Sequence, residues 1–365
     1  MVRIQEIIDV IETFAPLSYQ ESYDNAGLLV GDPTKKIKKA LLTLDCTEAI
    51  VDEAIAKNCS LIIAHHPIIF KGLTSITGKN YVERVIVKAI KKDIAIYACH
   101  TNLDNVLDGV NAKFASKLGL QNLRILRPQT NNLKKLYTYA PLSEAENIRQ
   151  ALYQVGAGTI GNYEQCSFNT IGLGTFKANK DAKPFIGSLD ALHEEKEVKI
   201  EVVYPTFIEK ALVKALHQAH PYEEIAFGLV EIGNANKHIG AGMIGELDKP
   251  MTEVNFLKHV KSRMKTTTIR HTALLDKPIQ KVALCGGAGS FLTNDAKKAG
   301  ADAYISSDFK YHEFFDAEAQ LLIADIGHFE SEQYTNEIFF ELLSKKFPNF
   351  AFLLNTVNTN PVNYF

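Results

Sequence analysis

The chain has 365 residues, which is more than a single hydrophobic core usually organises, so we expect two or three domains. Its composition, 46% hydrophobic and 22% charged, is typical of a globular protein. With 40 basic and 42 acidic residues the formal net charge is −2, which gives no whole-chain basic footprint. We therefore do not expect a protein that binds nucleic acid or an anionic membrane surface.

The cysteines and the N-terminal segment indicate the compartment. The five cysteines are odd in number, widely spaced and without a CxxC pair, which favours reduced thiols over a disulfide framework. The first residues, MVRIQEIIDVIETFAP, place apolar side chains at helical spacing with acidic ones between them, unlike a signal or transit peptide. No apolar run approaches membrane-spanning length. These features predict a cytoplasmic protein.

Two stretches of the chain alternate short apolar runs with amphipathic ones. In the first, the runs 40–45, 60–67 and 94–104 are each predicted to contain a strand, and helices are predicted between them at 47–58 and 81–93. The same alternation returns over 281–347 and ends in a long helix. The order is that of βαβ units with parallel sheets covered on both faces. Ala40 precedes His65 by 25 residues, as Ala283 precedes Asp308, which fits either a duplication or the ordinary length of a βαβ unit.

The segment between these stretches has a different pattern. It is entered through the polar residues RPQTNN and left through the glycine-rich GNANKHIGAGMIG. Its predicted elements follow the order βαββαβ, which is typical of a ferredoxin-like domain. We therefore predict an α/β protein with a discontinuous main unit of two related halves, mostly parallel in their sheets, and an inserted α+β domain. The predicted bounds are 1–126 for the first half, 127–234 for the insert and 235–365 for the second half.

Three of the predicted strands end at residues that bind divalent metals. The first ends at His65 and His66, the second leads into His100 and Asp104, and the third leads into His328. In open α/β sheets ligands bind beyond the carboxyl ends of the strands, where these side chains should gather. We expect His100 to line the pocket or to orient Asp104, and we do not count it as a ligand.

The third segment adds a helical pair. If a helix begins at His328, Glu332 lies on the same face at the i, i+4 position and can hold an ion with it, whereas Glu330 points elsewhere. A single histidine is more often a hydrogen-bonded structural residue than a ligand. The convergence of several segments favours the metal interpretation.

The doubled histidine favours two ions. Neighbouring side chains on a strand point to opposite faces, and Pro67 restrains His66 to an extended backbone. The two imidazoles of His65 and His66 therefore diverge and can serve different ions, with Asp104 bridging or completing the site. Imidazole and carboxylate ligands suit zinc first, with manganese or iron as alternatives.

Other candidate residues have two interpretations each. The loop with Gly286, Gly287 and Gly289 follows a strand and precedes a helix, so it is either an anion-binding loop or a tight turn. Asp308 is either part of the pocket, near a proton-transferring His312, or the cap of a helix. The segment HPYEE at 220–224 contains metal-binding residue types, but we favour a structural connection there.

Several separated segments together resemble the NGG-interacting-factor-three-like family of dinuclear-metal proteins, often labelled GTP cyclohydrolase I type 2 homologues. In chain order they are SYDNAGLLVGD, IIAHHP, HTNLD, GMIGEL, VALCGGAGS, SSDFKYHEF and DIGHFESE. The resemblance implies a binuclear centre on His65, His66, Asp104, His328 and Glu332. The family commonly has Trp where this chain has Tyr23, and Thr-Gly where it has Ser306-Ser307, so details of the pocket differ.

The resemblance also implies an assembly and an activity. The insert resembles the PII- and CutA-like modules of longer bacterial members, and the family implies a homohexameric ring. The first hypothesis for function is a hydrolase that uses two divalent ions per chain and metal-activated water on a nucleotide such as GTP or on a phosphoester. The alternative is a non-catalytic scaffold that stores, delivers or senses metal, with a ligand-sensing insert.

Overall fold

The computed structural model describes residues 1–365, and the chain separates into two units. The main unit consists of Met1–Pro128 and His238–Phe365, and the insert is Gln129–Lys237. No helix in the structure combines the length and the apolar character needed to cross a bilayer.

The first sheet of the main unit has the strand order β17-β4-β5-β6-β2. Its four strands β17, β4, β5 and β6 are parallel, whereas β2 pairs antiparallel with β6. All four residues of β5 are buried, as expected for a strand covered on both faces. The bounds are β2 (Gly27–Val30), β4 (Lys39–Thr43), β5 (Leu61–Ala64), β6 (Ala95–Ala98) and β17 (Ala351–Leu354), with a separate antiparallel pair β1 (Val2–Arg3) and β3 (Lys36–Ile37).

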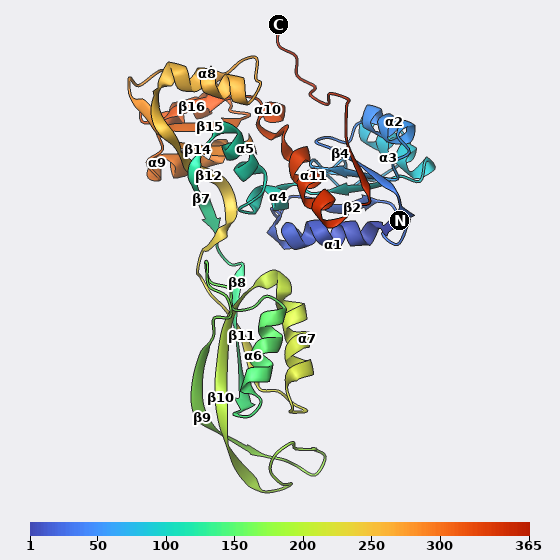
Figure 1. Cartoon of the computed structure of the whole chain (residues 1–365), viewed down its shortest axis with the longest axis vertical. Coiled ribbons are helices and arrows are strands. Elements are labelled where there is room, and N and C mark those ends of the chain that lie inside the picture. The colour runs from blue at the N-terminus through green and yellow to red at the C-terminus, as the bar shows by residue number, and fades with distance from the viewer. The chain divides into compact units, whose positions relative to one another are not determined.

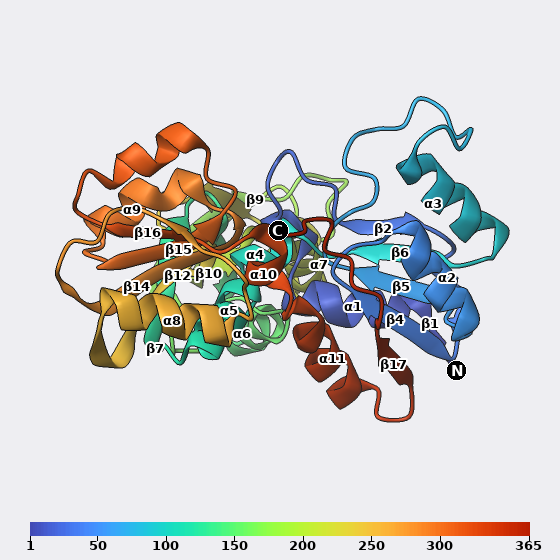
Figure 2. The ribbon, with the colours of Figure 1, turned by 90° about the horizontal axis from the view of Figure 1, so that it is seen from above.

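Helices cover both faces of this sheet (Figure 2). One face packs against α2 (Glu48–Ala56) and α3 (Tyr81–Lys91) through side chains such as Ile62 and Ile96. The other face packs against α1 (Ile4–Phe14) and α11 (Thr335–Lys346). Side chains alternate between the two faces of a strand. Ile63 therefore packs on the side of α1 and α11, whereas its neighbour Ile62 packs on the side of α2 and α3.

The second sheet of the main unit has the order β13-β16-β15-β14-β12-β7 and is mixed. Only β14, β15 and β16 are parallel, and β12 and β13 pair antiparallel with them, so the prediction of mostly parallel sheets was wrong for this half. Strands β12 and β14 pair antiparallel although the helix Glu253–Arg263 lies between them in the chain, so an intervening helix does not by itself specify a parallel pair. The bounds are β7 (Gln121–Gln129), β12 (Asn236–Thr252), β13 (Arg270–His271), β14 (Pro278–Ala288), β15 (Ala303–Ser307) and β16 (Leu322–Asp325).

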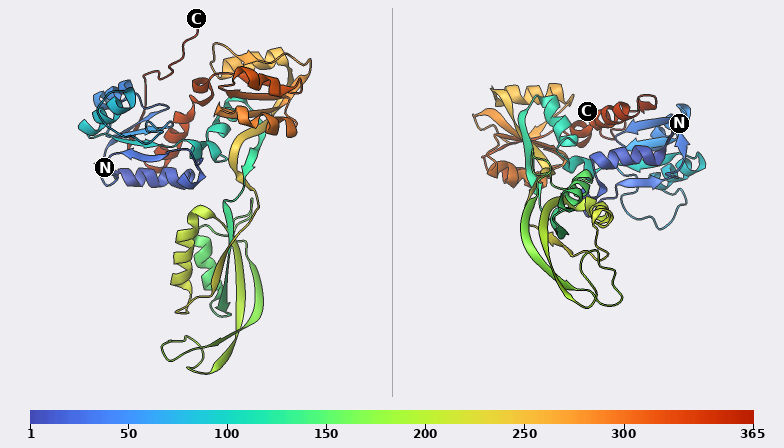
Figure 3. Two further views of the ribbon diagram at one scale, coloured as in Figure 1. Left: turned by 180° about the vertical axis from the view of Figure 1, so that it is seen from behind. Right: turned by 60° about the horizontal axis from the view of Figure 1, so that its bottom comes forward.

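This sheet is also covered on both faces (Figure 3). On one face Phe114 and Phe256 are buried from α5 (Val110–Leu118) and α8 (Glu253–Arg263). On the other face the core contains Leu292 and Ala296 from η3 (Ser290–Leu292) and α9 (Thr293–Lys298). The 3-10 segments η1 (Leu17–Tyr19) and η4 (Tyr311–Ala317) complete the main unit, together with the short helices α4 (Thr101–Asn105) and α10 (His328–Glu332).

The long C-terminal helix predicted from 328 onward is divided into α10 and α11. Gln333 and Tyr334 separate the two helices. The hydroxyl of Ser331 donates to the carbonyl of His328 at 2.8 Å, and that of Thr335 donates to the carbonyl of Glu332 at 2.7 Å. Such side-chain bonds to carbonyls three residues back compete with helical hydrogen bonding and favour the break.

The insert has the predicted βαββαβ order. Its antiparallel sheet runs β11-β8-β10-β9, with α6 and α7 on one face (Figure 1). From Val198 to Tyr204 every second residue of β10 is buried against these helices, and the residues between them face the other side. The bounds are β8 (Leu133–Pro141), α6 (Ala145–Gln154), β9 (Phe168–Lys177), β10 (Leu192–Pro205), η2 (Thr206–Ile208), α7 (Glu209–Ala219) and β11 (Phe227–Glu231).

Candidate metal centre

The five predicted metal ligands gather in one place in the main unit. His65 and His66 follow the carboxyl end of β5, Asp104 lies on α4, and His328 and Glu332 lie on α10. Both short helices are between the two sheets in Figures 1 and 2. Ligand atoms of these residues, together with one from His100, fall into three groups in which all atoms lie within 4.8 Å of one another.

The first group of donors is His66, His328 and Glu332. The Nε2 atoms of His66 and His328 lie 3.0 and 3.1 Å from Oε2 of Glu332, and 3.3 Å from each other. Tetrahedral zinc with Zn–N bonds of about 2.0–2.1 Å holds its ligand atoms roughly 3.3 Å apart. The spacing of these three atoms therefore fits a divalent metal ion.

The second group consists of His65, Asp104 and the other oxygen of Glu332. Nε2 of His65 lies 3.5 Å from Oδ1 of Asp104 and 3.9 Å from Oε1 of Glu332. The His65 and Asp104 atoms are buried and have no hydrogen-bond partner. Two buried acceptors that face each other are costly unless a cation satisfies both, so this group also fits a metal ion.

Hydrogen bonds at Nδ1 determine which nitrogen of each histidine is available. Nδ1 of His65 lies 2.8 Å from the carbonyl oxygen of Cys99, and Nδ1 of His66 lies 2.7 Å from Oδ1 of Asp45. Since a carbonyl oxygen only accepts, Nδ1 of His65 carries the proton and its Nε2 offers a lone pair to the site. The outer nitrogen, Nδ1, is thus held by a hydrogen bond, and the inner nitrogen, Nε2, faces the site. This arrangement is the usual one for metal-bound histidine.

His328 and His100 are held in the same way. Nδ1 of His328 lies 2.7 Å from Oδ2 of Asp308, and Nδ1 of His100 lies 2.7 Å from Oδ1 of Asp24. Asp308 has a left-handed backbone with φ of 58° and orients His328, instead of capping a helix. His100 groups with His65 and His66, and its hydrogen bond goes to Asp24 rather than to Asp104.

The carboxylates raise the proton affinity of the imidazoles. Burial lowers the pKa of His66, but Asp45 and Glu332 outweigh it and raise this pKa to about 9. The charge of Glu332, opposed by burial and helped by Asp308, raises the pKa of His328 to about 11. Burial, followed by the charge of Glu332, raises the pKa of Asp104 to about 7. Burial opposes ionisation of Glu332, yet His328 and its neighbours hold the pKa of Glu332 well below the usual value.

The glycine loop lies beside Glu332. The amide of Gly286 already donates to Asn111 Oδ1 at 2.9 Å, and that of Gly287 donates to Ser331 Oγ at 2.9 Å. A Cβ atom on Gly287 would lie 2.5 Å from Oε1 of Glu332. Two amides of the loop are thus engaged within the protein, and Gly286 and Gly287 provide space for Glu332, whereas anion binding by the loop of Gly286, Gly287 and Gly289 stays a prediction.

His312 lies on the exposed surface of η4. Its ring contacts those of Tyr311 and Phe315, with centroids 5.1 and 6.2 Å away. No hydrogen bond or ring contact joins His312 to the metal-binding groups, and a role for it in proton transfer stays a prediction.

Sequence reasoning missed two residues that orient the histidines. Asp45 follows β4, the strand next to β5, so the strand-end argument that selected His65 could have found it. Asp24 lies in the segment SYDNAGLLVGD, which contributed to the family resemblance but to which no orienting role was assigned. It also accepts hydrogen bonds from the backbone amide and the hydroxyl of Thr101.

Comparisons with known proteins find relatives over nearly the whole chain. The model of the family "Duf34/NIF3 (NGG1p interacting factor 3)" matches residues 2–361. A Bacillus subtilis protein named "GTP cyclohydrolase 1 type 2 homolog" is 39% identical over 366 residues, with 99% of this chain and 98% of the relative covered. A relative of the same name from Halalkalibacterium halodurans is also 39% identical, with the same coverage.

Solved structures show the same fold over the full length. A Bacillus cereus protein related to NIF3 superposes with a TM-score of 0.87 at 36% identity, and the match covers 100% of this chain and 99% of that one. A Staphylococcus aureus protein gives a TM-score of 0.79 at 30% identity with the same coverage. With a family model that spans nearly every residue and full-length relatives of the same fold, the chain belongs to the NIF3 (DUF34) family.

Proposed function

We propose that the protein is a metal-dependent hydrolase that holds two divalent ions per chain, with zinc as the first candidate. The observation that carries this proposal is the buried pair formed by His65 Nε2 and Asp104 Oδ1, which has no hydrogen-bond partner. Beside it, Glu332 directs one oxygen to His65 and the other to His66 and His328. Glu332 would therefore offer one oxygen to each of two ions, whereas the sequence suggested Asp104 as the residue that bridges or completes the site.

The chain's own residues supply a fixed and partly open donor set. Two divalent ions in this set would supply Lewis-acid activation of water and of an electrophilic substrate. Asp45 and Asp308 fix the ring orientation of His66 and His328 through their Nδ1 atoms. The side chains of His66 and His328 are 22% and 38% exposed, so the site opens to solvent on their side. Such an open side suits a catalytic centre better than a closed structural one.

The substrate proposal comes from the relatives. Proteins that share more than a third of their residues with this chain are named GTP cyclohydrolase 1 type 2 homolog, which makes GTP the first substrate to test. A phosphoester is the second, because paired metal ions commonly activate water for attack on phosphorus. The competing proposal is a scaffold that binds metal without turnover.

The test combines metal analysis with turnover. Protein purified without added metal is analysed for zinc, manganese and iron, and then assayed with GTP and with p-nitrophenyl phosphate before and after chelation. Asp104→Asn removes one charge from the buried pair, and Asp108→Asn is the matched control because Asp108 is exposed four residues further on. We expect turnover that chelation abolishes, that metal restores and that only Asp104→Asn reduces, by roughly 10²-fold or more.

Two results separate the proposals. Stoichiometric metal without turnover of either substrate would support the scaffold. Fewer than about one ion per chain would contradict the two-ion centre itself.

A further inference from the structure

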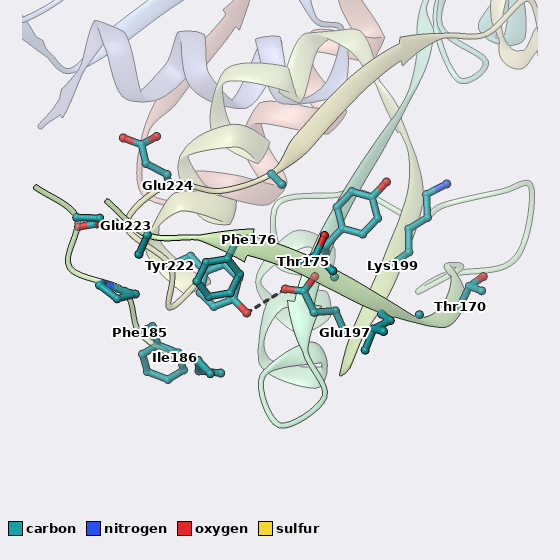
Figure 4. Close-up of a pocket in the computed structure, with 18 residues that line it drawn as sticks. Thr170, Thr175, Phe176, Phe185, Ile186, Glu197, Lys199, Tyr222, Glu223 and Glu224 are labelled. Carbon is teal, nitrogen blue, oxygen red and sulfur yellow. Dashed lines mark hydrogen bonds between the residues drawn. The ribbon is translucent and has the colours of Figure 1, made fainter. Parts of the chain in front are cut away.

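The insert contains a cavity of about 740 Å³ on the face of its sheet opposite α6 and α7 (Figure 4). This volume lies in the range of about 300–1,000 Å³ that small-molecule sites occupy. The cavity is lined by β9 and β10, by the loop after β9 and by residues 222–226 after α7. All of these residues belong to the insert, so the cavity is separate from the metal centre.

Glycines in β9 make room for the cavity. Gly172 and Gly174 lie opposite Glu197 and Glu195 of β10, on the face away from the helices. A Cβ atom on Gly172 would have no heavy atom within 4 Å, which means that it would point into open space. A Cβ atom on Gly174 would lie 2.1 Å from Oε2 of Glu197, so the absence of a side chain lets this carboxylate lie across the strand. The floor of the cavity is therefore a carboxylate over bare backbone.

The segment His220–Glu224 forms one wall. Nε2 of His220 lies 2.8 Å from the carbonyl oxygen of Tyr139 and must donate to it, while Nδ1 accepts from the amide of Tyr222 at 3.2 Å. Both nitrogens of His220 are thus engaged, and burial lowers its pKa, which keeps the ring neutral. His220 holds the turn and does not bind metal, as the structural interpretation of the sequence favoured.

Tyr222 connects this turn to the floor. Its hydroxyl donates to Oε1 of Glu197 at 2.9 Å (Figure 4), and burial together with the Glu197 charge raises the pKa of Tyr222. Oε2 of Glu197 lies on the other side of the carboxylate, over Gly174. The carboxylate is therefore fixed by one oxygen and presents the other.

The loop after β9 closes the cavity on a third side. Oε1 of Glu223 accepts from the backbone amide of Lys183 at 2.7 Å, and the ring of Phe185 lies 6.2 Å from that of Tyr222. These contacts join the loop to the turn after α7. The walls thus contain aromatic rings, namely Tyr139, Phe176, Phe185 and Tyr222.

The charges in the lining favour a cation. Glu197, Glu223 and Glu224 line the cavity with a single basic residue, Lys199, whose ammonium group pairs with Glu201 at 3.4 Å. Carboxylates and aromatic faces both attract ammonium groups. A metal ion is a poorer fit, because the groups of metal-ligating side chains at binding distance all lie in the main unit.

We propose that this cavity binds a small organic ammonium ion with an apolar or aromatic body. The ammonium group pairs with the free oxygen of Glu197, and the body lies over Gly172 between the aromatic walls. This site is independent of the metal centre and of the hydrolase proposal.

The experiment uses three probes that share one body. Tryptamine, tryptophol and indole-3-propionic acid carry an ammonium, a hydroxyl and a carboxylate on the same indole and two-carbon linker. Their binding to the full chain at pH 7.5 is followed by saturation-transfer NMR and titration calorimetry. We expect tryptamine to bind saturably, with a Kd roughly tenfold lower than that of tryptophol, and the acid to bind most weakly. A tenfold difference in Kd corresponds to only about 1.4 kcal/mol, which one pairing of an ammonium group with a carboxylate can supply.

Two pairs of variants locate the binding. Gly172→Leu fills the cavity, whereas Ile171→Leu changes a 69% exposed neighbour on the other face of β9. Glu197→Gln removes the charge and retains the shape, whereas Glu201→Gln removes a carboxylate of β10 outside the lining. Gly172→Leu and Glu197→Gln should weaken tryptamine binding by roughly five- to tenfold or more, and the two controls should not. Circular dichroism melting verifies that each variant is folded.

Three results would overturn the proposal. They are no saturable binding of tryptamine, equal binding of tryptamine and tryptophol, and binding that survives Gly172→Leu in a folded protein. A change of sedimentation coefficient in Gly172→Leu without loss of tryptamine binding would instead assign this face to a second copy of the chain.

Discussion

The Nε2 atoms of His66 and His328 face each other at 3.3 Å, although 262 positions separate the two residues. The Nδ1 atom of each ring is bound to its own aspartate, Asp45 for His66 and Asp308 for His328. Two segments that are distant in the chain thus bring their inner nitrogens to one point, where Glu332 adds an oxygen. Substitution of each residue that supports this arrangement should therefore have a measurable effect on metal binding.

The first prediction concerns the residue that orients His66. Asp45→Ala frees Nδ1 of His66, and we expect zinc affinity to fall about 10–100-fold, the usual cost of losing the partner of a metal-bound histidine. Asp52→Ala is the control, because Asp52 lies on the surface of α2 and pairs with Lys88. Zinc affinity is measured by competition with a chromophoric chelator. Equal affinities for the two variants would show that Asp45 does not support the site.

A second prediction tests the space that the glycine loop gives to Glu332. Gly287 has φ of +61°, and its added Cβ would lie 2.5 Å from Oε1 of Glu332, so Gly287→Ala should displace this carboxylate. Gly300 has φ of +70° with nothing within 4 Å of its Cβ position, so Gly300→Ala has the same backbone strain without the clash. Both variants should lose about 1 kcal/mol of stability from strain. Only Gly287→Ala should also weaken zinc binding, which the same competition assay measures.

Much of the centre could be predicted because it follows a local rule. Apolar runs such as Leu61–Ala64 identify buried strands, and the residues after parallel strands meet at one edge. That rule is sufficient to bring His65, His66 and Asp104 together. Helical spacing adds His328 and Glu332.

The remaining features depend on pairing across the fold. Asp24 reaches His100 over 76 positions, and no periodicity in the sequence specifies such a partner. The apolar pattern of a strand does not indicate whether the neighbouring strand runs parallel or antiparallel to it. The antiparallel pairing of β12 with β14 and of β13 with β16 was therefore not predicted. The position of Glu332, with one oxygen near His65 and the other near His66 and His328, likewise depends on the close approach of α10 to the loop of Gly287. Tertiary contacts determine these features.

A third prediction couples metal to stability. Buried acceptors without partners destabilise the metal-free protein, and a ligand that binds only the folded state adds about 2.7 kcal/mol of stability at 100 times its Kd. Zinc should therefore raise the melting temperature of chelator-treated protein in differential scanning calorimetry. Glu332→Gln should abolish this rise. Glu330→Gln should retain it, because Glu330 is also buried on α10 but accepts from Asn360 instead.

The fourth prediction concerns acid stability and the C-terminal segment. Glu53 on α2 accepts the amides of Thr356 and Val357 at 2.7 and 3.2 Å and pairs with Lys57 at 2.5 Å. Burial opposes its ionisation, but Lys57 and Thr356 outweigh burial and lower the pKa of Glu53 to about 2 from 4.5. Because the folded-state pKa is depressed, this contribution to stability is complete above pH 4.5 and is lost as the pH falls toward 2.

Glu53→Ala leaves these two amides without their acceptor. We expect it to lower the free energy of unfolding by about 1–3 kcal/mol at pH 7.5. The difference from the unsubstituted protein should narrow at pH 3.5, because the unfolded chain then binds a proton at this position that the folded chain does not. Glu48→Ala, which removes an exposed carboxylate paired with Arg84 on the same helix, should have little effect at either pH. Urea unfolding at both pH values measures the free energy of unfolding of each protein. If Glu53→Ala lowered it by the same amount at pH 7.5 and pH 3.5, Glu53 would not stabilise the fold through its charge.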